Sequence, residues 1–374
     1  MIYINSFFKI LIISVLMHLT FCFKNNNQDN LTTISKPDFT VKRGVNISHW
    51  LSQSNKNEEE RLNYFSEEDM KLIASLGYDH IRLPIDEKNM WDENGIKDTL
   101  AFQSLHSAIY WAKNNDLRVI VDLHIVRAHY FNNEYNPLWD DVTEQQKFVN
   151  LWRQLSLELK KYPNGLIAYE ILNEPVANNA KDWNDLLSET IKEIRLNEPF
   201  RTIVLGSNKW QSVDTFQNLK IPEEDSNIIL SFHFYSPHVF THYKAPWSKI
   251  GFYNGPIKYP GISINKEDLK EYTKEQISLL EDNVSYSKDF FQDKMQSAIQ
   301  IAKEYNLQLY CGEFGCFPST PNKDRMQWYS DIISVFNENN IAWANWDYQG
   351  GFGIIDSKTG VINKELIEVL IKDN

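Results

Sequence analysis

Short apolar runs alternate with amphipathic stretches along the chain from Lys42 onward. The apolar runs are nearly continuous, as in Leu117-Arg118-Val119-Ile120-Val121, which is typical of parallel strands buried on both faces. They predict strands near 42–47, 79–84, 118–124, 166–172, 201–206, 227–235, 308–313 and 341–346. This alternation indicates repeated β-α units.

The stretches between the strands carry helix signals. Ser66 precedes Glu67-Glu68-Asp69 and an apolar repeat, which predicts a helix N-cap at Ser66. Thr143-Glu144-Gln145-Gln146 resembles a capping box before another apolar repeat. Further helices are expected near 98–114, 181–197, 285–305, 322–339 and 363–371, with only a short helix around 211–218 after the fifth strand.

Alternating strands and helices fit either an open doubly wound sheet or a closed barrel. No glycine-rich phosphate turn follows the first strand, where Gly44-Val45-Asn46-Ile47-Ser48-His49 stands instead. We therefore expect the α/β class with a single (β/α)8 TIM barrel over residues 41–374. The long connection 236–284 follows strand six and is expected to be a functional loop over the active face.

The first residues resemble a targeting segment. Lys9 precedes the apolar stretch Ile10–Phe23, which is shorter than the roughly 20 residues needed to span a bilayer. We expect a signal peptide over 1–23, a polar tether over 24–40, and a secreted, cell-surface or periplasmic protein. Cys22 is a lipidation candidate, although the bulky Phe21 precedes it, and an uncleaved anchor is a further alternative.

Charge and composition narrow the choice of ligand. The net charge is −12 and no long run of Lys or Arg appears, which argues against a nucleic-acid partner. Aromatic residues make up 13% of the chain, and Trp and Tyr rings either fill a core or stack on flat sugar rings. We expect a neutral polysaccharide as ligand, no obligatory protein partner and a monomer.

Polar residues gather at the predicted strand ends, where barrel enzymes place their working groups. Glu174 ends strand four and Glu313 ends strand seven, so two carboxyl groups converge on one rim, as glycosidic hydrolysis requires. Arg82 and Tyr235 are placed to keep Glu313 ionised, and His233 to keep Glu174 protonated. The strand ends supply Arg82, His124, Asn173, Glu174, His233, Tyr235, Glu313 and Trp346.

This ordered set resembles the active site of glycoside hydrolase family 5, the cellulase family A group, over about residues 42–371. The resemblance implies a retaining mechanism, with Glu174 as acid/base, Glu313 as nucleophile, and no metal or organic cofactor. It implies a β-linked glucan as substrate, with endo-action on β-1,4-glucan expected first. The non-proline cis peptide often found in the family would fall at Trp346-Asp347.

Other binding residues and other functions stay open. His49 and Trp50 follow strand one, and Asn208 and Trp210 follow strand five, so all four are candidates for sugar subsites. An exo-acting β-glucanase or a β-mannanase is the nearest alternative. The pairs His124/His129 and His238/His242 invite a metal-dependent hydrolase, and a non-catalytic carbohydrate-binding protein is a further possibility, although neither glutamate is lost.

Overall fold

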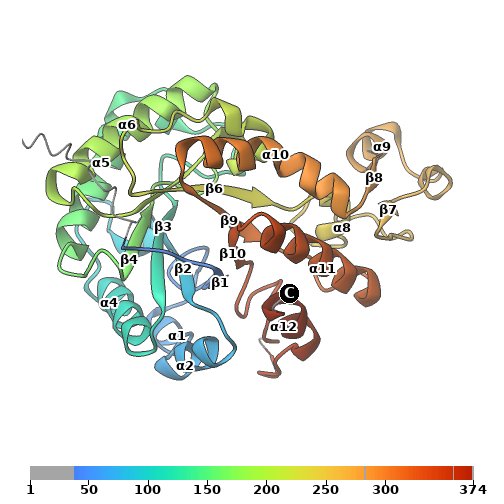
Figure 1. Ribbon diagram of the computed structural model, residues 1–374, viewed down its shortest axis with the longest axis horizontal. Coiled ribbons are helices and arrows are strands. Elements are labelled where there is room, and N and C mark those ends of the chain that lie inside the picture. The colour runs from blue at the N-terminus through green and yellow to red at the C-terminus, as the bar shows by residue number, and fades with distance from the viewer. Residues whose placement is uncertain (1–37, 282–283, 357, 373–374) are drawn as a thin grey trace, which may run out of the picture. The chain divides into compact units, whose positions relative to one another are not determined.

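The structure is a computed structural model that describes residues 38–281, 284–356 and 358–372. Within these residues eight parallel strands close into a barrel in the order β1-β10-β9-β6-β5-β4-β3-β2 (Figure 1). The strands are β1 (Arg43–Asn46), β2 (His80–Asp86), β3 (Arg118–Ile125), β4 (Ile167–Glu170), β5 (Ile203–Gly206), β6 (Ile228–Phe234), β9 (Gln308–Phe314) and β10 (Ala342–Asn345). The predicted α/β class and (β/α)8 barrel are confirmed.

Helices surround the barrel and connect its strands (Figure 1). The longer helices are α2 (Glu67–Ser75), α4 (Thr99–Asn114), α5 (Val142–Leu159), α6 (Ala180–Asn197), α10 (Lys288–Tyr305), α11 (Asn322–Glu338) and α12 (Lys364–Ile371). The shorter ones are α1 (Glu58–Leu62), α3 (Glu87–Met90), α7 (Asn208–Gln211), α8 (His238–Thr241) and α9 (Lys274–Leu280), with 3-10 turns η1 (Pro137–Trp139), η2 (Val213–Asn218) and η3 (Lys266–Leu269). The short helix predicted after strand five is η2.

Side-chain caps fix where the helices begin. Ser66 forms the expected cap of α2, because its side chain accepts the N–H of Asp69 while Asp69 bonds back to the Ser66 backbone. The capping box predicted at Thr143 is wrong: Asp141 is the cap of α5 and accepts the Thr143 N–H at 2.8 Å. Helix α10 begins at Lys288 rather than 285, because β8 (Ser285–Tyr286) pairs with β7 (Gly261–Ile262).

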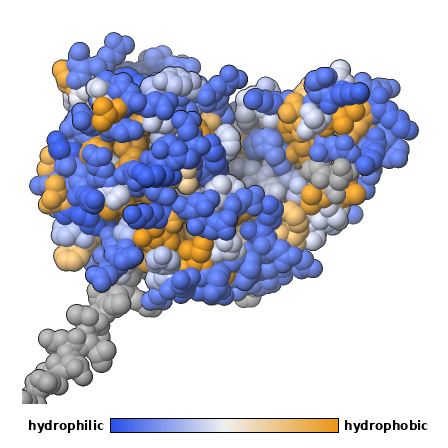
Figure 2. Space-filling view, turned by 90° about the horizontal axis from the view of Figure 1, so that it is seen from above, coloured by the Kyte–Doolittle hydropathy of each residue, from blue (hydrophilic) through white to orange (hydrophobic). Residues whose placement is uncertain are grey.

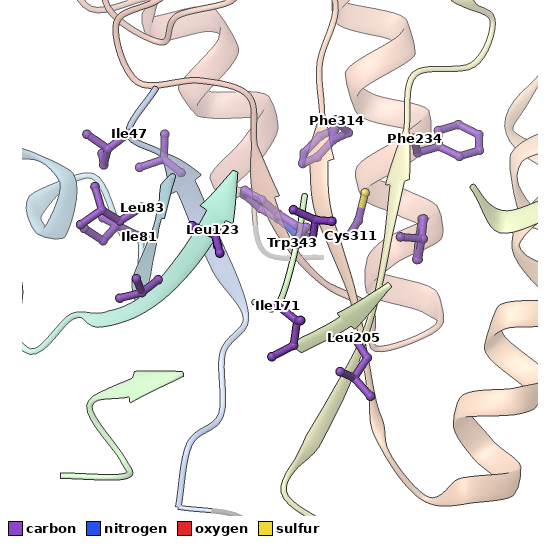
Figure 3. Packing of buried hydrophobic residues seen from close by; sticks show 14 of the residues in the cluster. Ile47, Ile81, Leu83, Leu123, Ile171, Leu205, Phe234, Cys311, Phe314 and Trp343 are labelled. Carbon is purple, nitrogen blue, oxygen red and sulfur yellow. The ribbon is translucent and has the colours of Figure 1, made fainter. Parts of the chain in front are cut away.

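Side chains alternate between the two faces of the barrel strands. One face packs against the helices in a large apolar cluster, part of which is labelled in Figure 3, including Ile81 and Leu205. The opposite face fills the barrel with a smaller cluster: Phe39, Val41, Ile120, Ala168, Val204, Ile229, Tyr310, Ala342 and Ala344. The barrel is therefore a packed core rather than a pore, and its chemistry is confined to its rim.

The amino-terminal boundary needs a correction. Phe39 is only 1% exposed and belongs to the cluster inside the barrel, so the predicted tether 24–40 ends before this residue. Burying its ring among Val41 and Ile120 stabilises the fold, which explains why an isolated aromatic residue joins the domain. The predicted signal peptide 1–23, Cys22 and most of the tether lie outside the described residues. In the described ranges, no helix has the length and apolar content to cross a membrane.

The segment 236–286 is a folded extension rather than a bare loop. It contains α8, β7, η3, α9 and β8, and its outer part stands away from the barrel at the right of Figure 1 and forms the right-hand lobe of Figure 2. Tyr259 anchors it: its hydroxyl donates to Asp331 Oδ2 at 2.7 Å, and its ring stacks on Phe291 with centroids 5.7 Å apart. The extension is thus fastened to α10 and α11.

Candidate active site

Arg82 is the centre of a buried ionic network inside the barrel. Strand β2 carries it, and its side chain is 0% exposed. Nε and Nη2 donate to the two carboxylate oxygens of Glu170 at 2.7 and 2.9 Å. Nη1 donates to Asn46 Oδ1 and Glu313 Oε1 at 2.9 and 2.7 Å, and Nη2 to Asn173 Oδ1 at 2.9 Å. A guanidinium bonded in this way holds its partners in one geometry, because its planar fork of donors is rigid.

Glu313 lies on β9 with both carboxylate oxygens bonded. Oε1 accepts from Arg82, and Oε2 accepts from the Tyr235 hydroxyl at 3.0 Å. The register of β6 and β9 shifts between Phe232 and His233, which places His233 directly opposite Glu313. Burial raises the pKa of Glu313, but Arg82 and His124 oppose this rise. The carboxyl group of Glu313 is therefore ionised more easily than that of Glu174.

Glu174 follows β4 and meets different surroundings. Its φ of 46° lies in the left-handed region, which is uncommon for a residue with a Cβ and clusters at functional sites. Its Oε1 lies 2.9 Å from Nδ1 of His233. Burial, and then the negative charge of Glu313, raise the pKa of Glu174 well above its usual range. Burial, and then Arg82, lower the pKa of His233, so its imidazole is neutral.

The two glutamates are close enough to act on one bond. An oxygen of Glu174 and an oxygen of Glu313 lie within 4.8 Å of each other. Carboxyl groups about 5–5.5 Å apart suit a double displacement, whereas inverting enzymes separate them by about 6.5–9.5 Å to admit a water. Two carboxyl groups whose surroundings push their pKa values apart form an acid and a nucleophile.

His124 and Trp346 form an aromatic wall beside this pair. His124 Nδ1 lies 2.7 Å from Asp122 Oδ2, which in turn lies 3.0 Å from Arg82 Nη2. Burial lowers the pKa of His124 to about 4, so the ring is neutral at ordinary pH. It stacks on Trp346 with centroids 5.8 Å and planes 10° apart. The peptide bond Trp346-Asp347 is cis, as the family resemblance implied.

Two of the expected binding residues lie outside the cleft. Trp50 is 1% exposed, its Nε1 donates to the Arg61 carbonyl at 2.8 Å, and its ring packs on Phe65. The amide of Asn208 is 4% exposed and bonds both the N–H and the carbonyl of Ala177, at 2.8 and 3.1 Å. The expectation that they bind sugar is wrong, because neither residue has a face free to do so.

Trp210 and His49 do lie at the rim. Trp210 is 50% exposed and sits in a left-handed turn, with φ of 58°, 60° and 52° at residues 209–211. Its Nε1 donates to the Phe131 carbonyl at 3.0 Å, and its backbone N–H to Pro175, next to Glu174, at 3.3 Å. His49 is partly exposed with φ of 56°. The turn therefore presents an indole to solvent in a fixed orientation.

The predicted residues Arg82, His124, Asn173, Glu174, His233, Tyr235, Glu313 and Trp346 all come together in one network. Asn46, Asp122 and Glu170 belong to it as well and were not predicted. A feature of the sequence could have identified them: each is a polar residue inside a strongly apolar strand, which indicates a side chain in the barrel interior. Asp122 stands between Val121 and Leu123, and Glu170 between Tyr169 and Ile171.

A metal ion would find one set of three or more donors among the described residues, namely Glu174, His233 and Glu313, with ligand atoms within 4.8 Å of one another. Arg82 already bonds this set through Glu313, which lowers its attraction for a second cation. In each of the histidine pairs His124/His129 and His238/His242, at least one member is hydrogen-bonded to a protein group. His238 bonds Ser248 at 3.3 Å and His129 Nε2 accepts the Val176 N–H at 3.3 Å.

A (β/α)8 barrel with two converging glutamates at its rim defines a glycoside hydrolase. The chain belongs to glycosyl hydrolase family 5, the cellulase family, whose model matches residues 42–351. It is 31% identical over 344 residues to Endoglucanase C of Acetivibrio thermocellus. The aligned region covers 89% of this chain and 98% of that protein.

Two solved structures resemble the barrel closely. Cellulose synthase subunit Z of Clostridioides difficile is 26% identical, with a TM-score of 0.72 over 89% of this chain and 100% of that chain. A mutant form of Thermotoga maritima Cel5A in complex with cellobiose is 26% identical, with a TM-score of 0.72 over 89% and 97% of the two chains. Both likenesses extend along nearly the whole barrel.

Proposed function

We propose that this enzyme cuts internal β-1,4 bonds of glucan by double displacement, with retention of the anomeric configuration. The observation that carries the proposal is the close pair Glu174 and Glu313, in which Arg82 and Tyr235 bond one carboxyl group and His233 the other. The similarity to Endoglucanase C over 89% of this chain, and to a relative solved with cellobiose, supports the choice of polymer.

In the first step Glu313 attacks the anomeric carbon while the bond to the leaving oxygen breaks and Glu174 gives that oxygen its proton. Arg82 keeps Glu313 ionised and oriented, and Glu170 in turn holds Arg82. The Tyr235 hydroxyl donates to the other oxygen of Glu313, so the two bonds together fix the orientation of the carboxylate. The product is a glycosyl ester of Glu313 and a free sugar end.

In the second step Glu174 works in the opposite direction. The ester at Glu313 carries no charge, so the repulsion that helped raise the pKa of Glu174 is removed and Glu174 becomes an effective base. It takes a proton from water, the water oxygen attacks the anomeric carbon from the opposite face, and Glu313 leaves as a carboxylate. Two inversions at one carbon give net retention.

Three groups are placed to hold the sugar. Trp346 offers an indole wall beside His124. Asn173 Oδ1 is bonded to Arg82, whereas its buried Nδ2 has no partner within the described residues and is free to donate to a sugar hydroxyl. Trp210 extends this surface past Glu174, as an exposed ring of this kind stacks on a pyranose.

The proposal is tested by mixing the enzyme with a panel of β-1,4-glucan, mixed-linkage glucan, β-1,3-glucan and mannan and sizing the products. We expect a range of oligosaccharides from β-1,4-glucan at early times, because an internal cut leaves chains of many lengths. On cellopentaose, NMR should show the β-anomer first. Release of a single short product would indicate exo-action. Release of products from mannan alone would reject β-1,4-glucan as the substrate. Appearance of the α-anomer first would reject the retaining mechanism.

Replacing Trp210 with alanine should weaken the binding of long substrates more than the binding of short ones. We expect the KM for cellohexaose to rise about 10-fold, since a stacked ring contributes on the order of 1–2 kcal/mol. The KM for an aryl β-cellobioside, which is too short to depend on every subsite, should change less. Tyr110→Ala, at an exposed aromatic residue of helix α4, is the matched control. Equal effects on both substrates would show that the indole serves the fold instead.

A further inference from the structure

The turn after β1 brings a glutamine to the imidazole of His124. Gln53 Nε2 lies 3.2 Å from His124 Nε2. The other ring nitrogen, Nδ1, lies 2.7 Å from the Asp122 carboxylate, and Arg82 bonds that carboxylate. Because the ring is neutral, its proton lies on Nδ1 and the lone pair on Nε2, so the Gln53 amide is the donor. The glutamine therefore fixes the side of His124 that faces away from Asp122.

A second buried carboxylate holds the backbone of this turn. Gln53 has φ of 49°, an unfavourable conformation for a residue with a Cβ, and its N–H donates to Asp86 Oδ2 at 2.7 Å. Asp86 is fully buried at the end of β2. His49 Nδ1 lies 3.3 Å from the Gln53 carbonyl, which closes the turn on itself. Such a conformation persists only where surrounding bonds maintain it, so the position of the Gln53 side chain is determined by Asp86.

The side chain of Gln53 still has capacity to bind. His124 is 1% exposed, whereas Gln53 is partly exposed at the rim. Of the described residues, only His124 is bonded to the Gln53 side-chain amide. One N–H and the carbonyl oxygen of the amide therefore remain for a ligand, and together they form a donor–acceptor pair. His124 also stacks on Trp346, so the Gln53 amide and the Trp346 indole both contact the same imidazole.

We propose that Gln53 binds the hydroxyl groups of the sugar that stacks on Trp346. One amide N–H donates to one hydroxyl and Oε1 accepts from its neighbour, while the bond to His124 fixes the direction of the amide. Asp86 is a positioning residue that acts through Gln53. This assignment rests on the proposed function, since a chain of β-linked sugars supplies the neighbouring hydroxyls.

Kinetics of Gln53→Ala on cellopentaose test the assignment. We expect kcat/KM to fall about 10-fold to 100-fold, as loss of hydrogen bonds to a ligand predicts, with most of the change in KM. Gln145→Ala is the matched control, because Gln145 is also half-buried and donates its side-chain N–H to the Leu138 carbonyl. Adding Asp86→Ala to Gln53→Ala should cost nothing further if Asp86 acts through Gln53.

NMR of the His124 ring tests the contact between Gln53 and His124 directly, independently of any substrate. Gln53→Glu keeps the shape of the side chain but places a carboxylate beside Nε2, which should raise the pKa of His124 above its low wild-type value of about 4. An unchanged titration of His124, or an unchanged kcat/KM in Gln53→Ala, would overturn the assignment. If wild type fails to cut cellopentaose, the proposed function is rejected instead, and the NMR result still decides whether Gln53 bonds His124.

Discussion

Glu313→Gln is expected to lower kcat on cellopentaose by about 10⁴-fold or more, since no other group can form the covalent intermediate. The amide cannot attack the anomeric carbon, yet it keeps the shape of the side chain and can still accept from Tyr235 or Arg82. Arg82 also retains its two bonds to Glu170, so the variant should fold. Initial rates and thermal unfolding of the same preparation measure both effects.

The smaller variant Glu313→Ala identifies the role of the residue. It leaves space where the carboxylate stood, so azide can enter and attack the anomeric carbon of a dinitrophenyl β-cellobioside directly. We expect azide to restore turnover and give an α-glycosyl azide, the product of a single inversion. Glu338→Gln, at an exposed glutamate of α11, controls for loss of charge alone. A β-glycosyl azide, or full activity without azide, would contradict the assignment of Glu313 as nucleophile.

The sequence was sufficient to bring the two glutamates together because Glu313 lies at the carboxyl end of β9 and Glu174 follows the carboxyl end of β4. A barrel collects the carboxyl ends of all its strands on one rim, so residues far apart in the chain meet there without any knowledge of the loops. The near-continuous apolar runs made the strands recognisable. Arg82, His124, His233 and Tyr235 followed from the same rule. The structure bonds Arg82, His233 and Tyr235 directly to one of the two glutamates, and it links His124 to Glu313 through Asp122 and Arg82.

The loops were less predictable because their backbone conformation decides which side chains reach the cleft. Trp50 and Trp210 both follow a strand closely in the sequence, but Trp50 turns into the core and a left-handed turn carries Trp210 to the surface. Apolar pattern does not encode such turns. Gln53 was missed for the same reason, as its place depends on a left-handed φ and on Asp86. Strand register, not composition, brought Glu170 beside Arg82.

Glu174→Gln should impair the enzyme in a way that depends on the leaving group. On cellopentaose the sugar oxygen needs a proton to depart, so kcat/KM should fall about 10³-fold to 10⁴-fold, the upper range for a general acid. Dinitrophenolate leaves without protonation, so the first step on a dinitrophenyl β-cellobioside should proceed at nearly the wild-type rate. The second step lacks its base, and a burst of dinitrophenolate followed by slow turnover is expected in stopped-flow absorbance.

The pH dependence separates Glu174 from a residue that merely supports the fold. In wild type, kcat/KM should fall as the pH rises through the pKa of Glu174, because the acid must be protonated, and fall at low pH as Glu313 gains a proton. Since burial and Glu313 raise the pKa of Glu174, the alkaline fall should lie above the usual range of a glutamate. On cellopentaose, whose leaving oxygen needs a proton, Glu174→Gln should lose this alkaline fall and keep the acidic one. An equal loss on both substrates with an unchanged pH profile would show that Glu174 is not the acid, and the proton donor would then have to be sought elsewhere in the site.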